Sequence, residues 1–255
     1  MRFASLGSGS KGNATLVEWQ DTCVMIDCGF SVKQVTGRLK ALGKKPQDLS
    51  AILVTHEHSD HWKGVLPLAT RYSIDIYLTP GCLRAVELSK ASFEGIKLIE
   101  SGLTFQIGDL SIQPVPVPHD AREPVQYLFF STQHKLGILT DLGSVTPHIV
   151  DLYSDCDGLI VEANHDSELL AAGSYPAFLK ERVGGPWGHL NNNQTAELIA
   201  TIDQQRIQYI VVAHISQSNN DPQRVKEVIE KAYKGPGKVC FANQQEGFDW
   251  LHLAE

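Results

Sequence analysis

Four residues that can bind a metal ion lie within six positions of the sequence, in the pattern His-x-His-x-Asp-His: His56, His58, Asp60 and His61. They follow the apolar run Ala51-Ile52-Leu53-Val54, which predicts a buried strand that ends in a ligand-bearing loop. Three imidazoles and a carboxylate this close together are costly to desolvate unless they bind something. A divalent ion removes that cost, and nitrogen and oxygen donors without cysteine suit zinc, manganese or iron in an open site. His56 and His58 can bind one ion, and Asp60 and His61 a second; the alternative is a solvated histidine-rich loop.

Further candidate ligands stand where other apolar runs end: His119, Asp141, Glu162 and His214. Sites in α/β folds collect at strand ends, so we expect these side chains to lie close together. His119 follows Pro116 and Pro118, which predict a strand end and then a loop. A lone histidine there could be structural, but a four-coordinate site still needs ligands beyond the first cluster. The Asp141 carboxylate could bridge two ions.

Asp27 also ends an apolar run, and two interpretations of it remain open. Its carboxylate could orient the ligand histidines through a hydrogen bond. It could instead cap the helix expected over Ser31–Leu42, although Ser31 itself stands near the expected start of that helix.

A glycine-rich segment, Gly7–Asn13, follows the first expected strand. Its backbone amides could approach an anion closely, so it is a candidate phosphate cradle. The G-K-[ST] ending of a Walker loop is missing. A plain hairpin loop between two strands is the alternative.

The order of expected elements predicts a layered α/β architecture, with strands early, then alternating strands and helices, then strands again. Nothing repeats at a fixed period and no low-complexity linker divides the chain, so we expect one domain over residues 1–255. The expected helices cover Ser31–Leu42, Lys63–Arg71, Pro80–Ser92, Tyr175–Val183, Gln194–Gln205 and Gln223–Lys234.

Composition limits the classes of function. The 255-residue chain has a formal net charge of −7, so a nucleic-acid substrate would have to be attracted by local patches and bound metal. Five widely spaced cysteines without a C-x-x-C motif fit a reducing, cytoplasmic environment. No secretory leader and no run of about 20 apolar residues is present, so no membrane association is expected. The oligomeric state stays open.

Several motifs in order resemble the metallo-β-lactamase superfamily, and within it the YycJ/WalJ-like branch. The histidine-rich run 55–61 and Val24–Gly29 match the superfamily. The match to the branch depends on Leu6–Asn13, Val117–Ala121, Thr140–Gly143, Glu162–Asp166, Gly188–Leu190, His214–Ser216 and Asn219–Asn220. The resemblance covers essentially the whole chain. It implies a four-layer αββα sandwich of two mixed sheets with helices on the outer faces, and a cytoplasmic 5′→3′ DNA exonuclease that is also similar to RNase Z.

The resemblance also implies a ligand set for two divalent ions, Zn²⁺ or Mn²⁺. His56, His58 and His119 would bind one ion, Asp60, His61 and His214 the other, and Asp141 would bridge them. Asp60, His189 and Glu162 are the expected catalytic residues, with Glu162 orienting His189. Asp27 and His165 would position ligands. Ser8, Ser10, Lys11, Asn13 and Asn191 would contact a nucleic acid with a 5′ end, although Asn191–Asn193 departs from the Ser-Asn expected after Gly-His-Leu.

Such a site suits phosphodiester hydrolysis, because two ions that share a hydroxide provide a nucleophile at neutral pH. His189 could contact phosphate or protonate the leaving group, or it could merely cap the helix that follows it. Trp62 and Trp187 are expected in the core, with base stacking as the alternative. Other functions that remain open are a small-molecule or cyclic phosphodiesterase, an RNA-processing nuclease, and a metal-stabilised protein without enzymatic activity.

Overall fold

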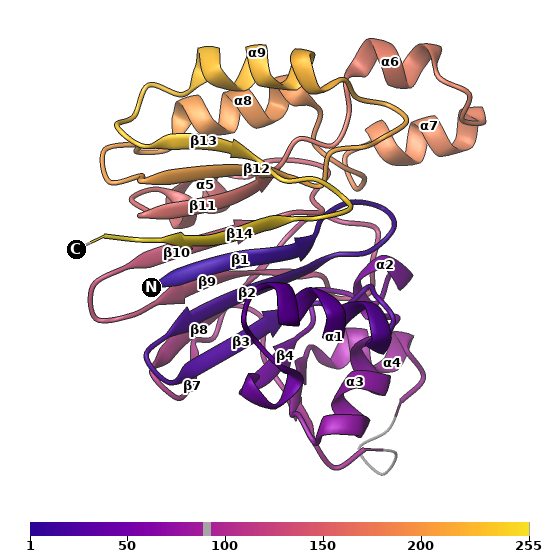
Figure 1. Ribbon diagram of the computed structural model, residues 1–255. Helices are drawn as coiled ribbons and strands as arrows, with labels where there is room; N and C mark the ends of the chain where they lie inside the picture. Colours follow the sequence, from indigo (N-terminus) through magenta and orange to yellow (C-terminus); the bar gives the residue numbers. More distant parts are fainter. Residues whose placement is uncertain (89–92, 255) are drawn as a thin grey trace. The chain divides into compact units, whose positions relative to one another are not determined.

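The computed structural model describes residues 1–88 and 93–254, which form two compact units (Figure 1). The first unit contains Met1–Pro116, Ala121–His134 and Asn243–Glu255, and the second contains Val117–Asp120 and Lys135–Ala242. The expectation of one domain over residues 1–255 stays a prediction.

A mixed sheet forms the centre of the first unit, with the strand order β14-β1-β2-β3-β4-β5-β6. Neighbouring strands pair antiparallel from β14 to β3 and parallel from β3 to β6. The strands are β1 (Arg2–Gly7), β2 (Ala14–Trp19), β3 (Thr22–Ile26), β4 (Ala51–Leu53), β5 (Ile76–Leu78), β6 (Ile96–Leu98) and β14 (Phe248–His252).

Three more strands of the first unit pair antiparallel: β7 (Phe105–Ile107), β8 (Leu110–Pro116) and β9 (Val125–Phe130). They pack on the first sheet, because the fully buried Tyr127 of β9 donates its hydroxyl to the carbonyl of Val54 at 2.7 Å. Tyr77 of β5 also stacks on Phe105 of β7, with ring centroids 5.4 Å apart. A buried hydroxyl needs such a partner, so this bond fixes the strand β4 that leads into the histidine-rich run.

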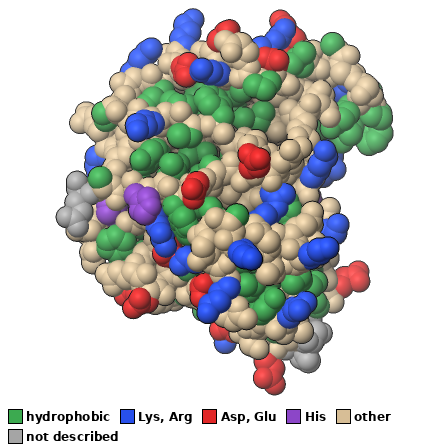
Figure 2. Space-filling view, in the orientation of Figure 1, with side chains coloured by type: hydrophobic (Ala, Val, Ile, Leu, Met, Phe, Trp, Pro, Cys, Tyr) green, Lys and Arg blue, Asp and Glu red, His purple; other side chains and the backbone are tan. Residues whose placement is uncertain are grey.

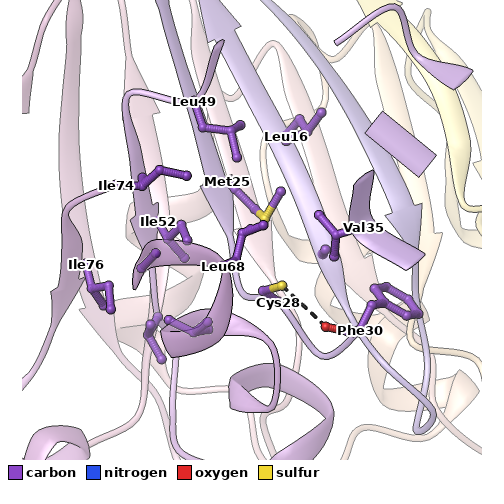
Figure 3. Packing of buried hydrophobic residues seen from close by; sticks show 14 of the residues in the cluster. Leu16, Met25, Cys28, Phe30, Val35, Leu49, Ile52, Leu68, Ile74 and Ile76 are labelled. Atoms are coloured by element: carbon purple, nitrogen blue, oxygen red, sulfur yellow. Dashed lines mark hydrogen bonds between the residues drawn. The ribbon is translucent and has the colours of Figure 1, made fainter. Parts of the chain in front are cut away.

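Helices cover one face of the first sheet: α1 (Val32–Ala41), α2 (Ser59–Trp62), α3 (Val65–Tyr72) and α4 (Pro80–Ala85), with a 3₁₀ turn at Pro46–Asp48. Figure 3 shows Met25 and Ile52 from the strands meeting Val35 of α1 and Leu68 of α3 in one apolar cluster. Ser31 caps α1 by accepting a bond from the amide of Gln34. Ser31 is therefore the N-cap of α1, and Asp27 does not cap this helix.

The second unit contains four parallel strands: β10 (Lys135–Leu139), β11 (Gly158–Glu162), β12 (Tyr209–Ala213) and β13 (Lys238–Phe241). Its helices are α5 (Pro147–Tyr153), α6 (Ser167–Ala172), α7 (Ala177–Gly184), α8 (Asn192–Thr201) and α9 (Pro222–Ala232). Figure 1 shows α8 and α9 along β12 and β13, whereas α6 and α7 lie beyond the strand ends. Strands buried on both faces are expected in a parallel ladder covered by helices.

The predicted α/β class with two mixed sheets and helices is confirmed, and the second sheet has the order β13-β12-β11-β10-β9-β8-β7. The helix expected over Pro80–Ser92 ends at Ala85, and residues 89–92 lie outside the described residues. The short helices α2, α5 and α6 were not expected. In the described part of the chain, no helix has the length and apolar character needed to cross a membrane.

Candidate metal centre

The first ligand group consists of His56, His58, Asp60 and His61, and it follows β4 directly. Nε2 of His56 lies 3.0 Å from Nδ1 of His58, and the rings of His56 and His61 have centroids 4.2 Å apart. Asp60 and His61 lie on the single turn of α2, not in the expected loop. His56 and His61 are buried, so these imidazoles have lost their water shell and need polar partners.

Asp27 provides such a partner. Its carboxylate accepts from the Thr55 amide and hydroxyl at 2.8 and 2.7 Å, and it lies 2.7 Å from Nδ1 of His61. Burial raises the pKa of Asp27, and the facing His61 opposes that rise. A carboxylate at Nδ1 fixes the ring orientation and leaves Nε2 of His61 as the ligand atom. The geometry favours the orienting role expected for Asp27.

Asn13 contacts this ligand group, and its expected contact with substrate stays a prediction. Its side-chain nitrogen lies 3.3 Å from Oδ2 of Asp60 and 3.1 Å from Nε2 of His61. Its side-chain oxygen accepts from the Gly9 amide at 2.8 Å. Asn13 therefore connects the glycine-rich segment to two candidate metal ligands.

Backbone amides in the rest of the expected phosphate cradle donate hydrogen bonds to other parts of the protein. The Ser8 amide donates to Asn243, and the Lys11 amide to the side chain of Gln244, at 3.2 and 2.6 Å. Ser10 and Lys11 are exposed, whereas Ser8 is buried. Because these amides already have acceptors, substrate contact by Ser8, Ser10 and Lys11 stays a prediction.

The second ligand group consists of His119, Asp141, Glu162, His189 and His214, all within the second unit. Ligand atoms of His119, Asp141 and His189 lie within 4.8 Å of one another, and so do those of Glu162, His189 and His214. Nε2 of His214 lies 3.4 Å from Oδ1 of Asp141, and the rings of His189 and His214 stack with centroids 5.1 Å apart. The strand-end pattern therefore did identify residues that meet in space.

Glu162, at the end of β11, is fully buried and organises this group. One oxygen accepts from the amides of Leu142 and Leu190, at 2.7 and 3.3 Å. The other lies 3.0 Å from Nδ1 of His189. The same carboxylate thus fixes the His189 ring and the backbone beside Asp141, as expected for a residue that orients a functional histidine.

His189 does not cap helix α8. Asn191 does so, because its side-chain oxygen accepts from the Gln194 amide at 2.9 Å and the Gln194 side chain accepts in turn from the Asn191 amide. This excludes the helix-capping alternative for His189. It also gives Asn191 a structural task, so its expected contact with substrate stays a prediction.

Three of these residues have a left-handed backbone: Asp27, Asp141 and His214, with φ of 60°, 54° and 51°. Each follows a strand within two positions. Non-glycine residues adopt this conformation at some energetic cost, and such strain concentrates at functional sites. The sharp turn at each strand end aims the side chain while the backbone leaves the sheet.

Some positions differ from the expectations. Trp62 packs against the core of the first unit as expected, but Trp187 is 61% exposed, so its predicted core position is wrong. The loop that carries Trp187 is held by backbone bonds instead of by burial of the indole. His165 is buried, and burial lowers its pKa to about 4. Its Nδ1 has no hydrogen-bond partner among the described residues, so its expected positioning role stays a prediction.

Asn164 was missed. Its side-chain nitrogen lies 3.1 Å from both Nδ1 and the carbonyl of His214, and so it positions a candidate ligand. Its place directly after the Glu162-Ala163 strand end is a signal that could have found it.

The donors of both groups are imidazole nitrogens and carboxylate oxygens, without a thiol. That donor set fits divalent zinc, manganese or iron. His189 is close enough to His119 and Asp141 to act as a further ligand, which the sequence did not suggest. The predicted sharing of ions between residues of the two groups stays a prediction.

Comparison with known proteins places this site in a family. The model of the beta-lactamase superfamily domain matches residues 22–215. The chain is 37% identical over 223 residues to exodeoxyribonuclease WalJ of Streptococcus pneumoniae serotype 2, covering 86% of this chain and 83% of that protein. It is 32% identical over 245 residues to exodeoxyribonuclease YycJ of Bacillus anthracis, covering 94% and 93%. The chain belongs to the metallo-β-lactamase superfamily, in the WalJ/YycJ branch.

Solved structures agree on the metallo-β-lactamase fold. Zn²⁺-bound PqqB from Methylobacterium extorquens superposes with a TM-score of 0.77 at 18% identity, covering 99% of this chain and 100% of that chain. The short form of human tRNase Z superposes with a TM-score of 0.70 at 19% identity, with full coverage of both chains. At this identity the likeness shows the fold alone.

Proposed function

We propose that this chain is a metal-dependent phosphodiester hydrolase, a 5′→3′ exonuclease on DNA. The observation that carries the proposal is the match to two proteins named exodeoxyribonucleases over more than four fifths of each length. The two ligand groups support it, because both contain the donors that a hydrolytic metal site requires.

Two divalent ions, Zn²⁺ or Mn²⁺, would be held by His56, His58, Asp60, His61, His119, Asp141 and His214. Bound there, they would supply a nucleophilic hydroxide at neutral pH and neutralise charge on the phosphate. Asp27 and Asn164 would hold His61 and His214 in orientation, and Glu162 would hold the turn beside Asp141 through its bond to the Leu142 amide.

His189 would act on the scissile phosphate. Its Nδ1 faces Glu162, so Nε2 is the atom left to contact a phosphate oxygen or to give a proton to the leaving oxygen. Because Glu162 also binds two backbone amides, its position does not depend on substrate. This is the arrangement of an oriented acid–base histidine, with a buried carboxylate behind it.

Substitution of the catalytic histidine separates its two possible tasks. His189→Ala should leave the metal content of the purified protein unchanged and lower turnover by about 10²- to 10⁴-fold. Asp141→Ala should instead reduce metal content, because it removes a ligand. Both are measured by elemental analysis together with hydrolysis rates. If His189→Ala lost metal in the same way as Asp141→Ala, His189 would be a ligand and not the proton donor.

A substrate panel tests the proposed activity. It contains 5′-phosphorylated single- and double-stranded DNA, a tRNA precursor and bis-(p-nitrophenyl) phosphate, each with Zn²⁺ or Mn²⁺ supplied. DNA should be degraded fastest. Turnover of only the small ester would favour the second candidate, a small-molecule phosphodiesterase, which the net charge of −7 supports because it does not attract polyanions.

We also propose a cytoplasmic location. All five cysteines are unpaired, which fits a reducing compartment. The expected partner is nucleic acid with a free 5′ end.

A further inference from the structure

The loop that carries Trp187 is fixed to the second ligand group by hydrogen bonds. Nδ1 of His119 bonds to the carbonyl of Gly188 at 3.0 Å. The Ser144 hydroxyl donates to the carbonyl of Pro186 at 3.2 Å, and the His189 amide donates to Val183 at 2.9 Å. The residues on both sides of Trp187 are therefore bonded to a candidate ligand or to the segment that follows one.

Close packing of backbone atoms also joins the loop that carries Trp187 to the turn that carries Asp141. Gly143, two residues after Asp141, lies against the backbone of Pro186 and Gly188. A Cβ at Gly143 would stand 2.4 Å from both the Gly188 nitrogen and the Pro186 carbonyl carbon, a distance that real Cβ atoms do not show. The turn that carries Asp141 and the loop that carries Trp187 thus touch backbone to backbone.

Trp187 nevertheless leaves 61% of its surface exposed, and it stands two residues before His189. The bonds that fix the loop use backbone atoms, so the indole is not needed to hold it. An exposed indole on an anchored loop is a ready contact surface, since a rigid aromatic gains contact area with little loss of conformational entropy. Figure 2 shows that hydrophobic side chains also gather over the α6–α7 part of the surface, so exposure alone does not distinguish Trp187 from them; the anchoring of its loop to the ligand group does.

We propose that Trp187 stacks on a nucleobase of the DNA strand whose phosphate reaches His189. This inference rests on the proposed function and names how the substrate is held. The chain has a net charge of −7, so broad electrostatic attraction to DNA is absent. Stacking on an aromatic ring supplies affinity without that attraction, and it is tolerant of sequence because every base has a π-face.

Phe178 of α7 provides the matched control. It is 71% exposed, in the same unit and nine residues before Trp187. No residue of α7 is buried, and no bond connects Phe178 to a ligand residue among those described. Loss of Phe178 therefore reports the effect of removing an exposed aromatic that is not anchored to the site.

The test measures binding and turnover separately with the metal-loaded protein. A fluorescent single-stranded DNA with phosphorothioate ends, which slow hydrolysis, is titrated and followed by anisotropy. A second strand of the same length lacks the bases of its terminal nucleotides at both ends. Wild type is compared with Trp187→Ala, Trp187→Phe and Phe178→Ala, and turnover is then measured on the corresponding unmodified strands.

We expect Trp187→Ala to weaken binding of the complete strand by about 5- to 100-fold. Trp187→Phe should recover most of that loss, and Phe178→Ala should match wild type. The wild-type protein should lose a similar factor on the strand without terminal bases, where Trp187→Ala should lose little more. Equal binding of the complete strand by Trp187→Ala and wild type, or an equal loss on both strands, would overturn the inference.

Turnover distinguishes this inference from the proposed function. Binding that depends on Trp187 without any DNA hydrolysis would refute the exonuclease and leave the stacking site standing. DNA hydrolysis and binding that are both insensitive to Trp187 would do the reverse. Absence of both binding and hydrolysis would overturn both.

Discussion

At the scale of single residues, buried polar side chains hold the ligands in place. Asp27 accepts two bonds from Thr55 and faces His61, and Glu162 accepts from two amides and faces His189. Both carboxylates are buried, so neither can exchange these partners for water. Each therefore fixes one nitrogen of its histidine and leaves the other for metal or substrate.

Asn13 should prove to be a positioning residue. Asn13→Ala removes the contact to Asp60 and the bond from Gly9, so we expect metal affinity to fall by about 10- to 100-fold. Competition with a fluorescent chelator measures that affinity. Asn243→Ala is the control, because that side chain bonds to nearby turn amides, of Gln245 and Glu246. An equal affinity in Asn13→Ala and wild type would contradict the assignment.

His165 should make stability depend on pH. Burial lowers its pKa to about 4, whereas the unfolded chain has a value near 6.5. The unfolded state therefore takes up a proton first, so stability is complete above about pH 6.5 and is lost as pH falls toward 4. Between about pH 7.5 and 5, the unfolding free energy of wild type should fall by about 2 kcal/mol more than that of His165→Gln. Urea denaturation measures both, and parallel losses would refute the assignment.

At the scale of elements, the candidate metal ligands lie where strands end. The spacing within His56–His61 and the apolar run before it are local features of the sequence. They were therefore enough to predict a cluster of ligands and the buried strand that leads into it. The contacts of Asn13 with Asp60 and of Thr55 with Asp27 join distant segments, and no local pattern encodes them. Helices α2, α5 and α6 have four, seven and six residues, too few for a helical period to be recognised.

At the same scale, Gly143 is a position where an added side chain would meet the backbone of a neighbouring loop. Gly143→Ala should lower the unfolding free energy by about 1 to 3 kcal/mol, because the added Cβ meets backbone atoms that cannot swing away. Gly37→Ala, in the interior of α1 with no atom within 4 Å of the added Cβ, should raise it by about 0.5 to 1 kcal/mol. Denaturant titration of both variants checks the contrast. A Gly143→Ala protein as stable as wild type would show that the loop at Pro186–Gly188 can move aside.

At the scale of the whole molecule, the order of the motifs along the chain is enough to predict the family, and the fold class and the relatives agree with that prediction. The sequence did not predict which side chains near the site are exposed. Trp187 was expected inside because indoles are usually buried, but the bonds around Pro186 and Gly188 leave it exposed. In the expected phosphate cradle at Ser8–Asn13, the amides of Ser8, Gly9 and Lys11 donate to acceptors within the protein, and contact of this segment with substrate stays a prediction.

The most direct test of the central proposal is the polarity of DNA degradation. Single-stranded DNA with a 5′ phosphate is labelled at either end and incubated with the Zn²⁺- or Mn²⁺-loaded protein, with Asp141→Ala as the inactive control. A 5′→3′ exonuclease should release the 5′ label early as a mononucleotide, while the 3′-labelled strand shortens gradually. Intact DNA, or early release of the 3′ label with the 5′-labelled strand shortening gradually, would contradict the proposal.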